Sequence, residues 1–430
     1  MIKECLEIFE KKFNEEGMNL ILKDFRLKQG AYIQVKKDYT YDVVVIDKNY
    51  DIEKYKEIIE KDYLSLILDS NKSIKSKRIM SNNYLSFITK KKFIDILNND
   101  IDEYFDIFAN PSKKYKLKLE KEIILDWDIN AEKVNKNKIW IKENLINITK
   151  DLKLGAEDYI KVFFYGNIDT YREESEKYFK LNLFLKNEYC ILNNNELLGV
   201  PGNNITLNLK KPFLLNRTRK NDKPYLLDYK NAYLEKLFFD YLENEFRIGN
   251  NMIYISDDEI IPAKNTVAPR MFAGYLLVIG IGKSGAEILD CKTLTGYNPR
   301  LVLKFEDILN IDYTYYGNSI TDEYKNLYKE TKTLKELELL IDKLFFNNCM
   351  KFNYFNNDIK ESNYLSRVQA RELQLIKEAI FDFVYLGQKT AFKAKFEKSF
   401  LNIIEDSIKQ EKNLLAKHQY NLKEAIKEAI

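Results

Sequence analysis

The spacing of the apolar residues changes near residue 320, and this change constrains the fold more than any other feature of the chain. After Asp322 the apolar residues keep helical spacing, with no strand-like alternation. Before it, short runs rich in β-branched and aromatic residues alternate with stretches of helical spacing. The sequence therefore predicts an α+β fold, with a mixed α/β N-terminal portion containing hairpins over residues 1–320 and a C-terminal helical bundle over residues 321–430.

Several elements can be predicted individually. Helices are expected at 1–26 with a break near Gly17, and at about 52–68, 171–184 and 229–246; strands are expected at 31–35, 41–46, 123–127, 159–164 and 253–255. The clearest hairpin joins 275–281 to 286–291, because glycines bracket a polar turn between two apolar runs. The turn reads GIGKSG, but Leu277 stands where a Walker A loop requires a glycine, so a plain hairpin turn is predicted.

The composition is that of a folded protein with a large core. The chain has 430 residues, of which 45% are hydrophobic and 31% charged, so two or three domains are expected.

The longest apolar run, Met271–Gly282, is too short to span a bilayer, and no signal-peptide pattern is present. A cytoplasmic location without a membrane partner is therefore expected. Four cysteines lie far apart and should be reduced thiols, so neither zinc nor disulfides, nor any cofactor, is predicted.

Catalytic constellations are scarce in this sequence. His418 is the sole histidine, which excludes nucleases and hydrolases that need a histidine base or a histidine-ligated metal. Two carboxylate-only arrangements remain open for a metal-dependent nuclease: the first is Asp126 with Asp128, and the second is Asp257, Asp258, Asp290 and Lys292. Acidic pairs are common in a chain with 66 acidic residues, so solvated structural roles are favoured and no enzyme is predicted.

Net charge is only +3, so a nucleic-acid partner has to be argued from local segments. The first basic segment runs from Lys72 to Lys92 and contains no acidic residue. Its cations are Lys72, Lys75, Lys77, Arg78, Lys90, Lys91 and Lys92. Asn82, Asn83, Tyr84 and Phe87 stand between them, and such groups can hydrogen-bond to bases or stack on them. The segment is predicted to contact guide RNA or a partner subunit, with a solvated face as the alternative.

The second basic segment runs from Gly199 to Leu227. Its asparagines Asn203, Asn204 and Asn208 offer donors and acceptors suited to reading bases in a narrow groove. Its cations can neutralise phosphates, and they are Lys210, Lys211, Arg217, Arg219, Lys220 and Lys223. The alternative for this segment is a polar connecting loop.

Three segments resemble a known family. NNYLSFITKKK at 82–92, GVPGNNITLNLKKPFL at 199–214 and GYLLVIGIGKSGAEILD at 274–290 are similar, in that order, to stretches of the Csh-type large subunit of the type I-B CRISPR interference complex, Cascade. The resemblance spans about residues 1–310. It implies a non-catalytic subunit near the 5′ handle of the guide RNA, which recognises the protospacer-adjacent motif in double-stranded DNA and helps to open the duplex.

The resemblance also implies partners. They are guide CRISPR RNA, target double-stranded DNA, the helicase-nuclease, and the backbone, 5′-handle-capping and small subunits of Cascade. No active site is needed, because guide pairing supplies the sequence specificity. Two other functions remain open: a metal-dependent nuclease with a carboxylate-only site, and a general RNA-binding scaffold.

Overall fold

The structure is a computed structural model of the full chain. It describes residues 2–47, 50–184, 190–193, 196–201, 226–264, 272–282, 285–296, 300–314, 316–356 and 358–430. The chain divides into two compact units. The N-terminal unit contains residues 9–248 and 281–287, and the C-terminal unit contains residues 1–8, 249–280 and 288–430.

The N-terminal unit is built on a four-stranded mixed sheet in the order β2-β1-β4-β3. Its strands are β1 (Gly30–Val35), β2 (Tyr41–Ile46), β3 (Ser86–Lys90) and β4 (Tyr159–Phe163). The central strands β1 and β4 are parallel, and each pairs antiparallel with an outer strand. Gly30 has φ +154° and a Cβ there would lie 2.0 Å from the carbonyl oxygen of Tyr159, so the close pairing of β1 with β4 requires glycine.

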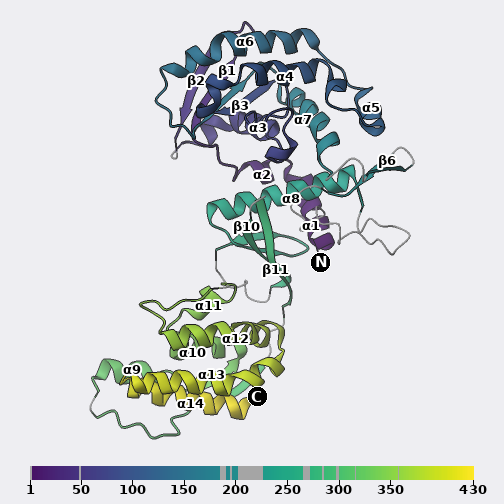
Figure 1. Cartoon of the computed structure of the whole chain (residues 1–430). Coiled ribbons are helices and arrows are strands. Elements are labelled where there is room, and N and C mark those ends of the chain that lie inside the picture. The colour runs from purple at the N-terminus through teal and green to yellow at the C-terminus, as the bar shows by residue number, and fades with distance from the viewer. Residues whose placement is uncertain are drawn as a thin grey trace. The chain divides into compact units, whose positions relative to one another are not determined.

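Helices cover both faces of this sheet (Figure 1). They are α3 (Lys56–Ser65), α4 (Asn98–Ala109), α6 (Ala131–Lys150) and α7 (Ile168–Asn182). Phe87 of β3 stacks on Phe105 of α4, with ring centroids 6.3 Å apart, so α4 packs on one face. On the opposite face, Lys161 of β4 contacts Asp62 of α3. Because both faces of the central strands β1 and β4 are buried, these two strands are mostly apolar rather than alternating.

Further elements complete the N-terminal unit. The α-helices are α1 (Ile2–Glu16), which begins in the C-terminal unit, α2 (Asn19–Leu22), α5 (Lys118–Ile124) and α8 (Tyr229–Ile248). The 3₁₀ helices are η1 (Glu53–Tyr55), η2 (Ser70–Lys72), η3 (Lys91–Ile96) and η4 (Pro111–Lys113). A small antiparallel sheet contains β5 (Ile191–Asn193), β6 (Glu196–Gly199) and β7 (Leu227–Asp228), in that order.

The C-terminal unit begins with an antiparallel sheet in the order β11-β10-β8-β9. Its strands are β8 (Met252–Ile255), β9 (Ile260–Ala263), β10 (Ala273–Gly282) and β11 (Gly285–Thr295). The neighbouring strands β10 and β11 confirm the predicted hairpin around GIGKSG. A second antiparallel pair joins β12 (Arg300–Lys304) to β13 (Glu330–Thr333).

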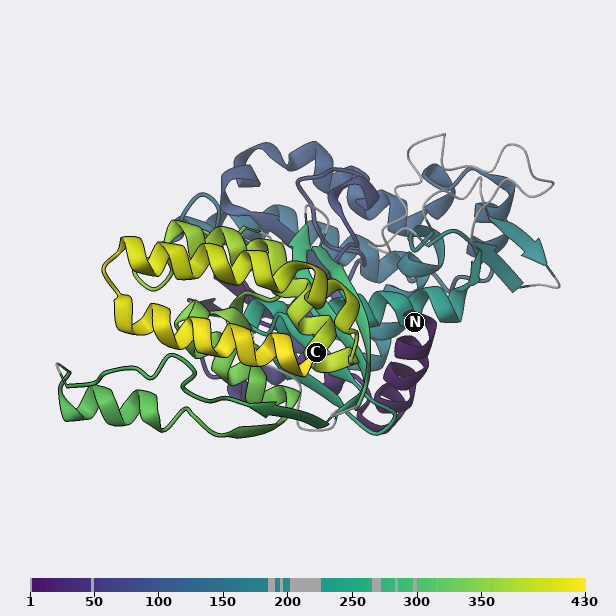
Figure 2. The same cartoon turned by 90° about the horizontal axis from the view of Figure 1, so that it is seen from below.

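Helices make up the rest of the C-terminal unit. They are α9 (Asn318–Lys325), α10 (Leu334–Phe346), α11 (Met350–Asn353), α12 (Arg367–Leu386), α13 (Lys389–Lys409) and α14 (Asn413–Ala429). Helix α12 begins with a capping box of Ser366 and Gln369, and it ends at Gly387, whose φ of +70° favours glycine. Figure 2 shows α13 and α14 lying side by side.

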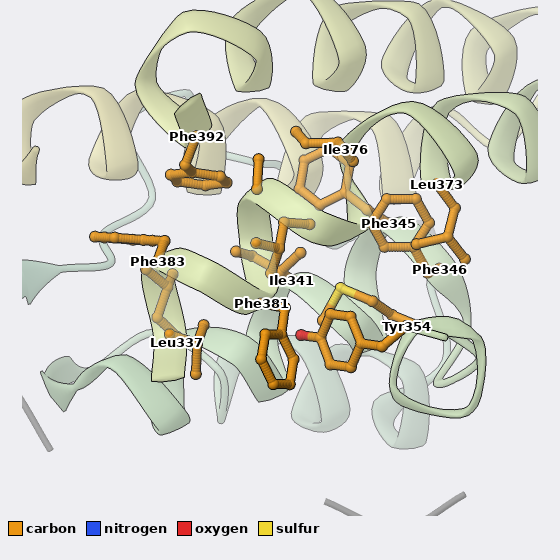
Figure 3. Close-up of a cluster of buried hydrophobic side chains, with 14 of the residues drawn as sticks. Leu337, Ile341, Phe345, Phe346, Tyr354, Leu373, Ile376, Phe381, Phe383 and Phe392 are labelled. Atoms are coloured by element: carbon orange, nitrogen blue, oxygen red, sulfur yellow. The ribbon is translucent and has the colours of Figure 1, made fainter. Parts of the chain in front are cut away.

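The core of the C-terminal unit is rich in aromatic side chains (Figure 3). Phe345 of α10 stacks on Phe400 of α13 with ring centroids 4.0 Å apart, and Phe383 of α12 stacks on Phe392 at 4.8 Å. Apolar residues of the strands, such as Leu276 and Leu303, belong to the same buried cluster. The helices and the β8–β12 strands of this unit therefore share one hydrophobic core.

The predicted α+β class and the C-terminal helical region are confirmed, with two differences. The predicted domain of residues 1–320 does not form one compact unit: residues 249–280 and 288–320 belong to the C-terminal unit, because their strands pack into the core of the C-terminal helices. The predicted strand at 123–127 is wrong: α5 occupies 118–124, and the Glu120 carboxylate accepts a hydrogen bond from the Leu117 backbone at its start.

Candidate nucleic-acid interface

The first basic segment follows the edge of the large sheet. It runs through η2, a loop, the edge strand β3 and the start of η3. Its cations are paired with acidic residues from distant parts of the sequence. Lys75 lies 3.1 Å from Glu103, and Arg78 lies 3.1 Å from Asp100. The segment is thus less positive in the folded protein than its sequence indicates.

Three other cations of the segment bind uncharged oxygens. The Lys72 ammonium donates to the backbone carbonyl of Phe184 at 2.7 Å. The Lys77 ammonium donates to Asn71 Oδ1 at 3.0 Å, and the Lys91 ammonium donates to the backbone carbonyl of Thr149. Lys91 therefore anchors the start of η3 on α6. This structural contact is sufficient to explain why residue 91 is a lysine, so no RNA contact is needed to account for it.

Lys90 and Lys92 share one carboxylate. Their Nζ atoms lie 2.8 Å and 2.5 Å from the two oxygens of Glu157. Hydrogen bonds from Lys90 and then Lys92 lower the pKa of Glu157 to about 2, and the bond to Glu157 raises the pKa of Lys90. Two positive charges against one negative charge leave an excess positive charge at this exposed place. Exposed ion pairs of this kind contribute little to stability.

Asn82 and Asn83 do not belong to any exposed face, which corrects their predicted role. Both side chains are fully buried. The Asn82 amide donates to the carbonyl oxygens of Leu64 and Leu66 at 2.9 Å, and Asn83 donates to Asn82 Oδ1 at 2.7 Å. These amides satisfy buried backbone groups and cannot reach RNA in the folded protein.

The aromatic residues of the same segment are buried too. Phe87 is fully buried, and Tyr84 is 7% exposed. Phe87 packs against Tyr104 and Phe105 of α4. They therefore form core contacts and are not available to stack on bases.

Most of the second basic segment lies outside the described residues. All of the predicted contacts are in this part: Asn203, Asn204, Asn208, Lys210, Lys211, Arg217, Arg219, Lys220 and Lys223. The structure does describe both ends of the segment. Gly199 of β6 pairs with Leu227 of β7, so the chain leaves and returns at adjacent positions of one small sheet.

Gly199 and Pro201, at the start of the second basic segment, both lie against Phe184. A Cβ at Gly199 would lie 2.4 Å from the ring of Phe184, so this strand position requires glycine. Pro201 forms an isolated bridge with Phe184. Packing against Phe184 thus explains the glycine at the start of the segment.

The carboxylates of the nuclease alternative are not gathered into a metal site in the described part of the chain. No group of three or more His, Cys, Asp or Glu suited to a metal ion occurs among the described residues. The Lys292 ammonium lies 3.1 Å from Asp382, and Asp290 accepts a hydrogen bond from the Cys291 backbone. Asp126 and Asp128 are exposed beyond the end of α5.

A buried ion pair that the sequence analysis missed lies on the other face of the large sheet. Lys161 of β4 and Asp62 of α3 have side chains that are each 1% exposed. Burial lowers the pKa of Lys161, while the Asp62 charge and hydrogen bonds oppose this effect. One signal in the sequence could have revealed this pair: the run YIKVF is apolar except for its lysine. A lysine in a fully buried strand is rare unless an acidic residue pairs with it.

Comparison with protein-family models, curated proteins and solved structures finds no match for this chain. In the described part of the chain, no helix is long and apolar enough to cross a membrane.

Proposed function

We propose that this chain is the non-catalytic large subunit of a type I-B CRISPR RNA-guided surveillance complex and works in the cytoplasm. In this role it binds guide RNA, recognises the protospacer-adjacent motif in double-stranded DNA, aids duplex opening and recruits the helicase-nuclease. The resemblance of residues 82–92, 199–214 and 274–290 to that family carries the proposal.

Two structural observations support this function. Lys90 and Lys92 present an excess positive charge at an exposed place, because a single carboxylate faces both ammonium groups. The two ends of the second basic segment are paired, because Gly199 of β6 lies opposite Leu227 of β7. A phosphate contact and a separate motif-reading segment are the two parts that such a subunit needs.

Co-purification tests the proposal. The tagged full chain is expressed with type I-B backbone and 5′-handle-capping subunits and a repeat-containing guide RNA. We expect one ribonucleoprotein that contains this chain and binds double-stranded DNA only when a protospacer-adjacent motif is present. A chain that remains outside the complex, or that cleaves DNA or RNA with magnesium by itself, contradicts the proposal.

The second basic segment can be tested in the same complex. Alanine at Lys210, Lys211 or Arg219 should weaken binding to every motif variant, and each lost contact should lower the log-log salt slope by about 0.9. Alanine at the asparagines, Asn203, Asn204 or Asn208, should cost about 1 to 3 kcal/mol on the preferred motif only. Equal losses across a panel of motifs would place motif reading elsewhere in the chain.

A further inference from the structure

A cavity of 580 Å³ lies in the N-terminal unit, on the sheet face opposite α4. Strand β4, helices α3 and α8, and the loop before β1 all contribute to its walls. This volume falls in the range of small-molecule sites, which is about 300 to 1,000 Å³. The cavity lies apart from Lys90 and Lys92, which do not line it.

The floor of the cavity is polar. It contains the buried pair Lys161–Asp62 and a second cluster, in which Lys236 of α8 lies 2.5 Å from Asp240 and 2.9 Å from the Tyr63 hydroxyl. Packing defects in protein cores are lined by apolar side chains. Buried ion pairs contribute little to stability compared with apolar residues of the same volume, so the buried Lys161–Asp62 pair beside the partly exposed Lys236–Asp240 pair points to a binding role.

Two cations of the loop before β1, Arg26 and Lys28, line the cavity. Lys28 is exposed, and its ammonium lies 5.1 Å from the centre of the Tyr159 ring. Among the residues that the structure describes, no carboxylate forms an ion pair with Lys28. Arg26 has a side chain 38% exposed, and Asp24 is 3.8 Å away from its guanidinium. Its Nη1 also donates to the backbone carbonyls of Lys23 at 3.1 Å and Phe25 at 3.3 Å, and both of these acceptors are uncharged. Lys28 and Arg26 therefore remain available for an anion.

We propose that this cavity binds a nucleotide, with its phosphate at Arg26 and Lys28 and its base against the polar floor. Arg and Lys side chains are the usual phosphate ligands. At the floor, the Lys236 ammonium is a donor and the Asp240 carboxylate, whose side chain is 29% exposed, is an acceptor, while the Lys161–Asp62 pair, with each side chain 1% exposed, contributes charge to the floor. Bare phosphate fits less well, because these carboxylates repel it. A free mononucleotide and one nucleotide of an RNA strand share this chemistry.

The test uses the purified full chain and isothermal titration with five probes: AMP, GMP, CMP, UMP and a 5′-phosphorylated RNA tetranucleotide. Inorganic phosphate is the comparison ligand. We expect at least one of the five probes to bind, and to bind more tightly than phosphate. Tighter binding of a mononucleotide indicates a free nucleotide ligand, and tighter binding of the tetranucleotide indicates an RNA strand. No binding of any probe at millimolar concentration overturns the proposal.

Two variants locate the site. Lys28→Ala should weaken binding about tenfold or more, since it removes a charge-assisted hydrogen bond. Lys23→Ala is the matched control, because Lys23 is exposed in the same loop but does not line the cavity. Equal effects of the two variants overturn the assignment.

A double variant probes the floor of the cavity. Asp62→Leu with Lys161→Met replaces the buried pair by apolar side chains, so the protein should stay folded but lose nucleotide binding. Retention of full affinity by the folded double variant overturns the assignment of the base to the floor. This experiment needs no other subunit and no target DNA, so its failure leaves the proposed role in Cascade untouched.

Discussion

Lys161 Nζ lies 2.7 Å and 2.5 Å from the two carboxylate oxygens of Asp62, which joins the central strand β4 to helix α3. The same ammonium lies 5.0 Å from the centre of the Tyr32 ring on the neighbouring strand β1. Lys161 thus takes part in an ion pair and a cation-π contact at the centre of the sheet. Lys161 and Asp62 depend on each other, because the charge of each buried side chain is neutralised by the charge of the other.

Removing one partner of this pair should destabilise the N-terminal unit. We expect Asp62→Ala to lower its free energy of unfolding by about 3 to 5 kcal/mol, because an unpaired ammonium remains buried. The double variant Asp62→Leu with Lys161→Met should lose far less, or even gain stability. Both tryptophans, Trp127 and Trp140, lie in the N-terminal unit, so tryptophan fluorescence in a denaturant titration reports on this unit alone.

The comparison between the single and the double variant shows whether the charges or the shapes of the two side chains stabilise the sheet. A loss in the double variant as large as that in Asp62→Ala would mean that the shape of the two side chains, and not their charge, stabilises the sheet. Lys36→Ala is a suitable control, because its ion pair with Asp42 is exposed and should contribute about 1 kcal/mol or less.

Asn82 should be needed for folding rather than for RNA binding. Asn82→Ala leaves the buried carbonyls of Leu64 and Leu66 without their donor, so we expect a loss of about 2 to 4 kcal/mol in the N-terminal unit. Tryptophan fluorescence in a denaturant titration again measures this loss of stability. The control Asn147→Ala removes an exposed amide of α6 and should not destabilise the protein. A stable Asn82→Ala protein with weakened RNA binding would instead return this residue to the interface.

The sequence was sufficient for elements that are encoded locally. The hairpin around GIGKSG and the helices after residue 322 follow from turn glycines and from periodicity, and the structure confirms both. Ion pairs between residues that lie far apart in the sequence could not be predicted from local patterns. Glu157 is 65 residues from Lys92, so the basic segment looked unpaired in the sequence although the fold neutralises part of it.

The same reasoning explains the error at Asn82 and Asn83. Polar residues within a basic segment are usually exposed, and no local pattern indicates that this loop is covered by α4 and α7. The amides are buried because Asn82 hydrogen-bonds to the chain after α3 and to Ser175 of α7. Such long-range hydrogen bonds become visible only when the helices are placed around the sheet.

Glu157 should restrain RNA binding at Lys90 and Lys92. In Glu157→Gln both ammonium groups lose their carboxylate, so we expect the purified chain to bind single-stranded RNA more tightly. Each additional phosphate contact should steepen the log-log salt slope by about 0.7. Measurement at two salt concentrations is sufficient. Glu143→Gln is the control, because it makes the same change of net charge at an exposed position of α6. If both variants tighten RNA binding equally, the effect is a general effect of net charge and is not specific to Lys90 and Lys92.

The last prediction concerns His418, which is fully buried in the C-terminal unit. Its ring stacks on Tyr324 with centroids 4.2 Å apart, and its Nδ1 lies 2.5 Å from the Tyr328 hydroxyl. Burial lowers the pKa of His418 to about 4, against opposition from the nearby Asp307 charge. The imidazole is therefore neutral in the folded protein at neutral pH.

The sign of the pH dependence follows from this lowered pKa. Between the pKa of the folded state and the usual value near 6.5, the unfolded chain binds a proton at His418 that the folded chain does not. The C-terminal unit should therefore lose stability as pH falls, by about 1 kcal/mol from pH 7.5 to 5.5. Hydrogen exchange in α10 and α12 measures this loss. His418→Gln should remove that part of the slope, whatever its effect on stability at pH 7.5.

His418 also permits a direct test, because the sole histidine of the chain gives a single imidazole signal in NMR. We expect this signal to keep the shift of the neutral ring as pH is lowered from 7.5 to 5.5. A titration with a midpoint near 6.5 in the folded protein would show that water reaches the ring. The pH dependence of stability at His418 would then vanish, because the folded and unfolded states would bind the same proton at the same pH.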